Sequence, residues 1–434
     1  MCPNKNPTLP IKPFWGVCNV FGQKEYIKLH TILSANKIQS EKTVNFLRSV
    51  FVSERNVVVL SVSILLILIP LSAWWNVLPL YFEDLGASQV EIGLIYSLIN
   101  ITSYGLQLPG GLLADRYGRR LLIALPTFSF IFCYFVAGVA WAWPIAAVAI
   151  IVANFFSGIQ GPAFTSIIAE SVEDKKQGTA FGMFEFFIDL GFVIGPLIGA
   201  MLIPFYGYTM FFYATGLVSG FSAFIRLVFL RETLPEKMQK SGRKFVLPKF
   251  DKNFLFFLFG CCLFSFTGGL LMPIMARYAQ DIIGLSFSQI ELMFSVSMVA
   301  MLIASIPCGK CIERIGAKKC LGIAFLVADL TVGLWAYSWS FEVALLIMSF
   351  SSAFVTLNYV GYNALISQLT VPETRGMAIG FSSLMLGVSA GVGSFVGPLL
   401  WVDLAPATPF LLTAVVCIPA ALLLIKVDTA QKIG

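Results

Sequence analysis

The chain has 434 residues, of which 58% are hydrophobic and only 12% are charged, and its mean hydropathy is +0.84. A water-soluble protein of this length needs more polar surface than that, so the composition excludes the soluble class and predicts that the lipid bilayer is the solvent. The net charge of +6 is explained by membrane orientation and by attraction to anionic lipid head groups, and we expect no nucleic acid partner.

The N-terminal segment, residues 1–56, is predicted to be a cytosolic tail. Basic residues outnumber acidic ones in it, and Val44, Leu47 and Phe51 recur at helical spacing. The interpretations that remain open are a short interfacial helix, a disordered tail, or a start codon assigned too early. The first long apolar run begins near residue 57, and no secretory signal peptide is visible.

Twelve apolar runs follow, each of roughly 20 residues, the length needed to cross about 30 Å of hydrocarbon at about 1.5 Å per residue. We predict an all-α membrane protein with twelve transmembrane helices in two six-helix bundles, 57–230 and 253–425. A cytosolic linker, 231–252, joins the bundles, and a cytosolic tail, 426–434, ends the chain. The predicted spans are 57–81, 90–113, 120–142, 144–169, 179–203, 208–230, 253–276, 288–309, 319–339, 342–366, 377–402 and 407–425.

Lysine and arginine set the predicted orientation, because cytoplasmic loops carry an excess of both. The turns on one side hold basic clusters such as the one at 116–120, whereas the turns on the other side hold only Arg277. Both termini are therefore predicted to be cytoplasmic, in a multi-pass protein of the cell membrane. Arg226, near the end of the sixth span, is expected to snorkel to the cytosolic interface.

Two landmarks recur at an offset of 198 residues. The turn at 111–120 reads GLLADRYGRR, and a degenerate copy at 309–319 reads GKCIERIGAKK. The segment GTAFG at 178–182 maps in the same way onto GMAIG at 376–380. Two landmarks in register indicate an internal duplication, which is typical of transporters built from two homologous halves.

The turn at 111–120 resembles the loop signature of the major facilitator superfamily, Gly-x-x-x-Asp-Arg-x-Gly-Arg-Arg/Lys, between helices 2 and 3. The match is complete in the first half and degenerate in the second. With the twelve spans, the basic linker and the repeat, the resemblance extends over nearly all of residues 57–425. It implies the major facilitator fold, with alternating access between the two bundles, in proteins that usually work as monomers.

A second motif, GFVIGPLIG at 191–199, resembles the helix 5 motif of the drug-proton antiporter branch, and GSFVGP at 393–398 echoes it in helix 11. Glycines four residues apart form a flat stripe for close helix approach, and proline bends the helix. Generic tight packing explains the same pattern, so both interpretations remain. The packing residues are Gly191, Gly195, Pro196, Gly199, Gly397 and Pro398.

Two parts that are usual in that branch are missing. An arginine is expected three residues before the pair Gln160-Gly161, but Ser157 occupies that position. Helix 1 lacks a membrane-embedded carboxylate around Asn76. These departures count against drug-proton exchange.

Glu185 and Asp189 in the fifth span are the leading candidates for proton coupling. They lie one turn and about 40° apart on a helix, so they share one face. A carboxylate inside the bilayer costs about 2.5–3.5 kcal/mol on insertion scales, and burial and like charge both favour a bound proton. The alternative is a structural role, in which either acid is hydrogen-bonded or Glu185 snorkels to the cytosol.

Helices 1, 4, 7 and 10 normally line the cavity of this superfamily, so their polar and aromatic residues are the substrate candidates that the resemblance implies. Amides and rings suit an amphiphilic or neutral solute better than a polyanion, although each of them could instead bond between helices. The candidates are Trp75, Asn76, Asn154, Gln160, Asn358, Tyr359, Tyr362 and Asn363.

Two further charged residues have weaker claims. Asp329 is midway along helix 9, which lies outside the cavity in this superfamily, so a structural hydrogen bond is favoured. Arg277 could attract an anionic substrate, but an ion pair with Asp281, four residues on, is the simpler interpretation.

The repeated turn is expected to act as a clasp. From the resemblance, Asp115 approaches the N-terminus of helix 11 near Gly376, where unpaired amides attract an anion, and Glu313 does the same for helix 5 near Gly178. These contacts should hold the outward-open state and break when the cavity opens inward. Arg116 or Arg119 is expected to pair with Glu170. The clasp residues are Gly111, Asp115, Arg116, Gly118, Arg119, Arg120, Glu170, Glu313 and Arg314.

Nine cysteines are scattered through the chain, mostly in apolar surroundings, so no disulfide framework is expected. Cys308, Cys311 and Cys320 are close in sequence, but their position at a helix end and the missing fourth ligand favour packing over a metal site. No catalytic or nucleotide-binding motif is visible, and we expect no enzyme activity, no metal and no cofactor.

These observations predict a secondary active transporter that moves a small organic solute, most simply as proton-coupled efflux of amphiphilic compounds. An uptake permease for a sugar, nucleoside or organic acid is the main alternative, and a substrate sensor that does not transport is a minor one. Substrate, direction and coupling ion are not encoded in any motif of this chain, because a cavity of amides and rings accepts many solutes.

Overall fold

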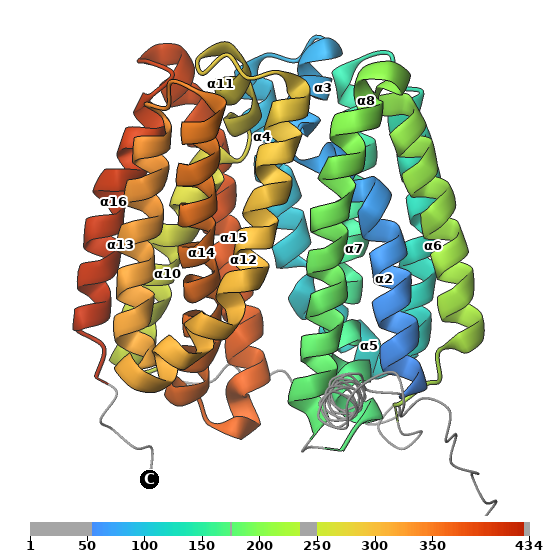
Figure 1. The fold of residues 1–434 in the computed structure, drawn as a ribbon. Coiled ribbons are helices and arrows are strands. Elements are labelled where there is room, and N and C mark those ends of the chain that lie inside the picture. Colours follow the sequence, from blue (N-terminus) through green and yellow to red (C-terminus); the bar gives the residue numbers. More distant parts are fainter. Residues whose placement is uncertain (1–53, 174–175, 235–249, 429–434) are drawn as a thin grey trace, which may run out of the picture. The chain divides into compact units, whose positions relative to one another are not determined.

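The computed structural model describes residues 54–173, 176–234 and 250–428, and within them every regular element is a helix (Figure 1). Nearly all of the predicted N-terminal tail and most of the linker and C-terminal tail lie outside these residues. The first bundle contains α2 (Arg55–Trp75), α3 (Leu78–Asp84), α4 (Gln89–Gly105), α5 (Gln107–Tyr117), α6 (Arg119–Gly138), α7 (Trp143–Ser171) and α8 (Gln177–Phe229). The second contains α10 (Lys252–Leu271), α11 (Met275–Asp281), α12 (Phe287–Ile315), α13 (Ala317–Trp335), α14 (Phe341–Leu369), α15 (Pro372–Asp403) and α16 (Thr408–Ile425).

Nine of the described helices are long and apolar enough to cross a bilayer. The longest, α8, has 53 residues and covers two predicted spans. Between these spans Gly207 leaves the helical conformation, at φ 70° and ψ 175°, so α8 consists of two helices joined at this residue. Glycine adopts this positive φ without a side-chain clash. Figure 1 shows the chain turning back at this end of α8. The prediction of an all-α membrane protein is confirmed.

The first, second and seventh predicted spans are interrupted rather than continuous. The first and seventh stop early and continue as the short helices α3 and α11, and the second is divided into α4 and α5. Pro79, Pro273 and Pro109 stand at these places. A proline has no N–H for the carbonyl four residues earlier and crowds that carbonyl, so the helices end about one turn before Pro79 and Pro109. Pro273 lies within its own break, between Leu271 and Met275.

Backbone geometry repeats at the 198-residue offset that the sequence motifs share. Gly118 and Gly316 both have φ 93°, at the turns that lead into α6 and α13. Ser88 and Ser286 both form capping boxes, with Glu91 at the start of α4 and Gln289 at the start of α12. The duplicated halves therefore share their helix starts and their turns, not only their sequence motifs.

The two bundles meet chiefly along two pairs of helices, α4 with α15 and α8 with α12, and to a smaller extent where α5 contacts α15 and α3 contacts α11. The approach of α4 to α15 is close, since a Cβ atom at Gly93 would lie 2.7 Å from the Ser394 carbonyl oxygen. The Asn100 amide donates to the Ser394 hydroxyl at 3.2 Å between the same helices. Figure 1 places α3 and α11 together at one end of the bundles, which we call the α3 end, and α5 at the opposite end.

Candidate functional site

Glu185 and Asp189 lie on the part of α8 that precedes Gly207, and both are half-buried. The Tyr359 hydroxyl of α14 donates to Glu185 Oε1 at 3.4 Å, so a side chain of the second bundle contacts the carboxylate of the first. This distance is long for a bond between two oxygen atoms, which makes the contact weak. Both bundles therefore contribute polar groups to one place between α8 and α14.

Of the four α14 candidates, Tyr359 and Asn363 have the exposed side chains, and Asn363 donates to the Tyr359 carbonyl at 3.0 Å. They lie one helical turn apart on the same helix face as the contact to Glu185. Tyr362 instead stacks on Phe257 of α10, with ring centroids 5.5 Å apart. Asn358 is half-buried. The structure thus brings Tyr359 to the carboxylate pair, leaves Asn363 exposed one turn further along α14, and directs Tyr362 into the packing of the second bundle.

The candidates on α2 and α7 mostly contact neighbouring helices of the first bundle. Asn154 accepts a hydrogen bond from Ser103 of α4 at 3.2 Å, and the buried Gln160 accepts one from Thr127 of α6 at 3.0 Å. Trp75 packs against Trp74 and Tyr96. The hydrogen bonds of Asn154 and Gln160 are the interhelical bonding that the sequence left open as an alternative to ligand contact.

The glycine motif of α8 packs on α2 within the first bundle. Gly195 lies against Ser72 and the Ile69 carbonyl, and the Ser72 hydroxyl donates to the Gly191 carbonyl at 2.9 Å. Its echo in α15 packs on α10 in the second bundle, where Gly397 lies against the backbone of Leu270. In both halves the stripe lets two backbones approach closely, as expected for small residues in membrane helices.

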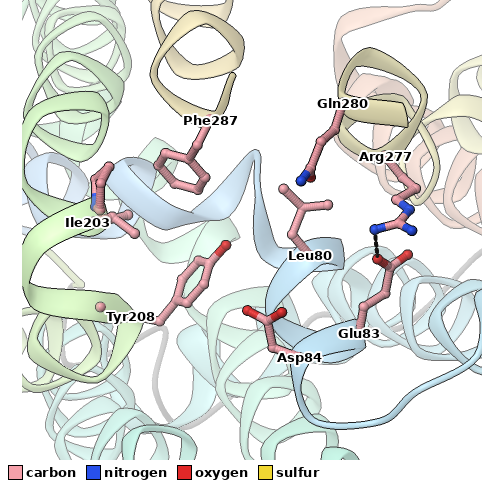
Figure 2. A pocket seen from close by; sticks show the side chains of 10 residues that line it. Leu80, Glu83, Asp84, Ile203, Tyr208, Arg277, Gln280 and Phe287 are labelled. Atoms are coloured by element: carbon pink, nitrogen blue, oxygen red, sulfur yellow. Dashed lines mark ion pairs between the residues drawn. The ribbon is translucent and has the colours of Figure 1, made fainter. Parts of the chain in front are cut away.

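A cavity of about 390 Å³ lies at the α3 end, where Gly207, α3, α11 and the start of α12 come together (Figure 2). Arg277 of α11 pairs with Glu83 of α3 at 2.8 Å and with Asp281 at 2.5 Å. Burial raises the pKa of Glu83 above its ordinary value, and the Arg277 guanidinium offsets part of that rise. Arg277 thus forms the expected pair with Asp281 and also connects the two bundles.

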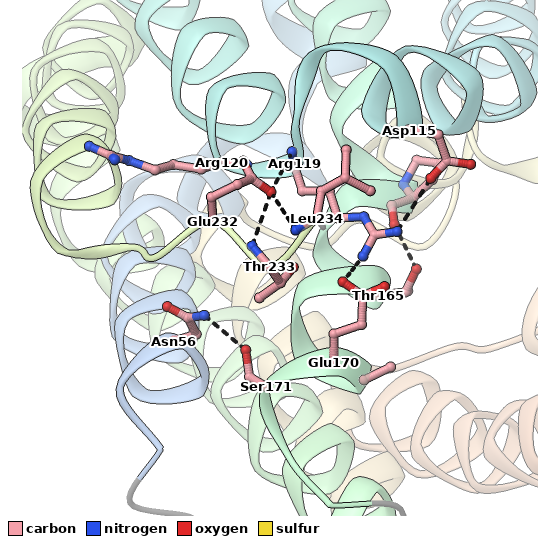
Figure 3. Close-up of polar contacts among 12 residues, drawn as sticks. Asn56, Asp115, Arg119, Arg120, Thr165, Glu170, Ser171, Glu232, Thr233 and Leu234 are labelled. Atoms are coloured by element: carbon pink, nitrogen blue, oxygen red, sulfur yellow. Dashed lines mark hydrogen bonds and ion pairs between the residues drawn. The ribbon is translucent and has the colours of Figure 1, made fainter. Parts of the chain in front are cut away.

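The repeated turn of the first half forms a polar cluster at the opposite end (Figure 3). Arg119 is buried and pairs with Glu170 of α7 and with Asp115, the latter at 3.3 Å. The carboxylate of Glu232 accepts hydrogen bonds from the backbone N–H groups of Arg119 and Arg120 at 3.1 and 3.0 Å. Glu232 thus binds the unpaired amides at the start of α6, as an N-terminal cap does.

The cross-bundle contact expected for this turn is not formed among the described residues. Asp115 pairs with Arg119 of its own bundle, and a Cβ atom added at Gly376 would meet no other atom within 4 Å. Glu313 and Arg314 of the second turn are exposed. The polar contacts between bundles instead lie from the α3 end to the level of Glu185, which describes a molecule closed at the α3 end.

The prediction that Arg226 snorkels to the interface is wrong, because its side chain is fully buried. It donates to the Ser63 hydroxyl at 2.8 Å and to the Thr127 hydroxyl at 2.7 Å, and its guanidinium lies over the Phe164 ring at 4.9 Å. Arg226 is close to the end of α8, but its face of the helix points toward α2 and α6 and not toward the interface. The position of Arg226 in the sequence indicates its depth in the membrane but not the direction in which its side chain points.

Asp329 has the structural hydrogen bond that its place in the ninth span favoured. The Thr267 hydroxyl of α10 donates to its carboxylate at 3.0 Å in a buried position. Cys311 and Cys320, across the turn between α12 and α13, have their sulfur atoms 3.5 Å apart. The described residues contain no group of three or more His, Cys, Asp and Glu side chains arranged to hold a metal ion.

Two acidic residues with clear structural positions were missed in the sequence. Glu232 follows the sixth span and looks like part of the polar linker, although it caps α6. Glu291 lies in the second turn of α12 and has no exposed surface. A carboxylate three residues inside the predicted span 288–309 was the available signal for Glu291.

The comparisons agree on one family. The family model described as Major Facilitator Superfamily matches residues 60–267 and 257–433. An uncharacterized MFS-type transporter of Methanocaldococcus jannaschii is 24% identical over 356 residues, which cover 79% of this chain and 90% of that protein. The quinolone resistance protein NorA of Staphylococcus aureus is 28% identical over 188 residues, which cover 43% of this chain and 48% of NorA.

Among solved structures, a bacterial homolog to the human lysosomal transporter Spinster, in an inward-facing and occupied conformation, has a TM-score of 0.69 at 16% identity. The match covers 85% of this chain and 95% of that one. At this identity the likeness shows the fold alone, and it agrees with the two-bundle architecture described above.

Proposed function

Because the chain belongs to the Major Facilitator Superfamily, whose members are membrane transporters and not enzymes, we propose that this multi-pass membrane protein exports amphiphilic organic compounds in exchange for protons. The observation that carries the proposal is the pair Glu185 and Asp189, which lies where Tyr359 of the second bundle contacts the first. Carboxylates in a membrane span are costly and are retained where a function needs them.

The proposed orientation places the α3 end at the outer face of the membrane. The turns at that end hold Arg277 as their one basic residue, whereas the turns at the opposite end hold the basic clusters of 116–120 and 314–319. Positive residues are retained on the cytoplasmic side during insertion. Both termini are then cytoplasmic, and the closed α3 end makes this the state in which the site faces the cytoplasm.

Exchange follows if proton and substrate compete for the same carboxylates. Glu185 and Asp189 are one turn apart and half-buried, and two carboxylates this close compete to remain charged, so the proposal has them share a proton when the site holds no substrate. A cationic amphiphile that enters from the cytoplasmic side neutralises the pair and releases that proton. The exposed ring of Tyr359 and the amide of Asn363 would contact the apolar and polar parts of such a solute.

The similarity to NorA supports export over import. It extends over 188 residues, so it concerns less than half of each protein. The missing arginine before Gln160 and the missing carboxylate in helix 1 are the features that distinguish this chain from the antiporter pattern. The α8 pair is therefore the group on which coupling depends in this proposal.

The test is internal pH in proteoliposomes of the full chain, with lipophilic cations and neutral metabolites added one at a time. Wild type should show proton flux that requires a solute, and Glu185→Gln and Asp189→Asn should each abolish it. Glu342→Gln is the matched control, because Glu342 is an exposed acid at the start of α14. Solute movement without proton flux would contradict the proposal.

Uptake of a neutral solute, such as a sugar or nucleoside, is the second candidate. The exposed hydroxyl of Tyr359 and amide of Asn363 favour it, since both suit a hydroxylated substrate. A growth defect of cells that lack the protein on one nutrient, with no sensitivity to hydrophobic cations, would support uptake. A purified protein that binds a solute but moves none would instead support the sensor interpretation.

A further inference from the structure

Glu291 of α12 is an acidic residue buried between the two bundles at the α3 end. Its side chain has no exposed surface. Ser288 and Ser295 lie on the same helix face, three residues before and four residues after it. Their hydroxyls donate to the Ala200 and Val193 carbonyls of α8, both at 2.7 Å. Glu291 is therefore in the face of α12 that is tied to the first bundle on either side of the carboxylate.

The Glu291 carboxylate has few polar neighbours in this position. The Asn76 amide, at the break between α2 and α3, approaches it as a hydrogen-bond donor. Neither Glu291 oxygen has a hydrogen bond of regular geometry with the described residues. Arg277, the cation of this end, is already paired with Glu83 and Asp281. An ionised carboxylate buried without a cation is strongly disfavoured, so the closed molecule holds Glu291 in its neutral form.

The other ionisable groups around Glu291 do not change this conclusion. From α8 the phenol of Tyr208 is near enough to interact electrostatically with Glu291 and with Glu83 and Asp84 of α3. All of these are acids, and none supplies a positive charge. The acid of α14, Glu342, is at the exposed start of that helix.

We propose that Glu291 is a proton-binding site, separate from Glu185 and Asp189, and that it is occupied when the α3 end is closed. When the α3 end opens, α12 separates from α8 and water reaches the carboxylate, which then releases its proton. Closing requires that the carboxylate takes up one proton again and that the Ser288 and Ser295 hydrogen bonds to α8 form again, and no other covalent bond is made or broken. The orientation of this site toward the outside rests on the proposed function.

The site is distinct from the central pair by position. Ser295 contacts Val193 on α8, and Glu185 is eight residues before Val193 on the same helix. Eight residues of a helix span about 12 Å, so the two acidic sites lie at different depths. Glu291 therefore responds to the state of the α3 end, whereas the central pair responds to the solute site.

The experiment measures how fast a cysteine at Val77 is labelled by a membrane-impermeant maleimide added from outside. Val77 is fully buried and packs with Leu270 and Ile274 of the second bundle, so it becomes accessible only when the α3 end opens. The full chain is used in cells, and the parent protein with its native cysteines provides the background. At each pH this rate is divided by that of Ala405→Cys, an exposed position at the same end, because the thiol itself reacts faster as the pH rises. With one linked proton, this ratio should rise with external pH by up to about tenfold per pH unit.

Glu291→Gln should remove this pH dependence and keep labelling slow, because the amide mimics the protonated acid. Glu291→Asp should keep the dependence, which shows that a folded protein with a carboxyl group behaves as expected. Ser295→Ala, which removes a neutral bond between the same helices, is the matched control and should also keep it. A pH dependence that persists in Glu291→Gln would overturn the proposal.

Glu185→Gln separates this inference from the proposed function. If the pH dependence survives in Glu185→Gln and is lost in Glu291→Gln, the site at the α3 end is established even when transport carries no proton. If Glu185→Gln alone removes the dependence, the central pair is the proton site and Glu291 is not.

Discussion

Arg277 of α11 pairs with Glu83 of α3 at 2.8 Å, so one guanidinium joins the second bundle to the first at the α3 end. The Arg277 side chain is 35% exposed, which limits the strength of the pair. We expect Arg277→Gln to open the α3 end more often and to speed labelling of a Val77→Cys reporter by about two- to fivefold. Equal labelling rates in Arg277→Gln and the parent would show that the pair does not hold this end closed.

The environment of Glu83 predicts how the stability of the folded protein changes with pH. Burial raises its pKa above the ordinary value of 4.5, more than Arg277 lowers it. A carboxyl group with a raised pKa in the folded state contributes stability below its unfolded pKa and loses it as the pH rises through the folded pKa. The apparent unfolding temperature in detergent should therefore rise from neutral pH toward 4.5, and less steeply in Glu83→Gln.

The same measurement on Arg277→Gln provides a check on the cause. Without the guanidinium, the pKa of Glu83 should rise further, so the increase in unfolding temperature on acidification should begin at a higher pH than in wild type. A smaller pH dependence in Arg277→Gln would mean that burial of Glu83 is not the dominant influence.

Arg226 should matter for folding and not for solute recognition. It donates to Ser63 and Thr127 from a fully buried position. Arg226→Lys keeps the charge but not the planar fork of donors, and we expect a loss of about 1–3 kcal/mol in the free energy of unfolding. Thermal unfolding of the purified variant checks this. A stable Arg226→Lys protein with altered substrate preference would assign the residue to the transport site instead.

A substitution at Asp115 tests the predicted clasp between the turn at 111–120 and the start of α15. If Asp115 binds the start of α15 when the α3 end is open, Asp115→Asn should shift the resting state toward the closed form described above. Labelling of Val77→Cys should then slow by about two- to fivefold. Glu170→Gln distinguishes the causes, because it removes a partner of Arg119 without removing the anion that faces α15. Unchanged accessibility in Asp115→Asn would count against the clasp.

The fold was largely predictable because hydropathy and the repeat depend on local sequence. The interruptions at Pro79, Pro109 and Pro273 were not predicted, because the apolar runs continue through them, although a proline is the signal that a helix is interrupted there. The candidate site was less predictable. Glu185 and Tyr359 are 174 residues apart and meet through the packing of two bundles, which no local pattern encodes.

Burial of single polar residues was the hardest property to predict. Glu291 is near the end of its span, where an acid normally reaches water, and it is buried only because α8 packs on that face of α12. The prediction for Arg226 was wrong for the same reason, since α2 and α6 cover the side of α8 on which Arg226 lies. In both cases the depth in the membrane follows from the sequence, whereas the direction of the side chain follows from neighbouring helices.

Gly118 and Gly316 have the same φ of 93°, so the turns that lead into α6 and α13 have the same backbone conformation in the two halves. Their chemistry has not been kept, because the positions 198 residues after Glu185 and Asp189 are Ser383 and Gly387. The two halves thus share the conformation of these turns, whereas the central carboxylate pair is present in the first half alone. A molecule of this kind can repeat the same turns in both halves and still hold its central carboxylate pair in one half alone.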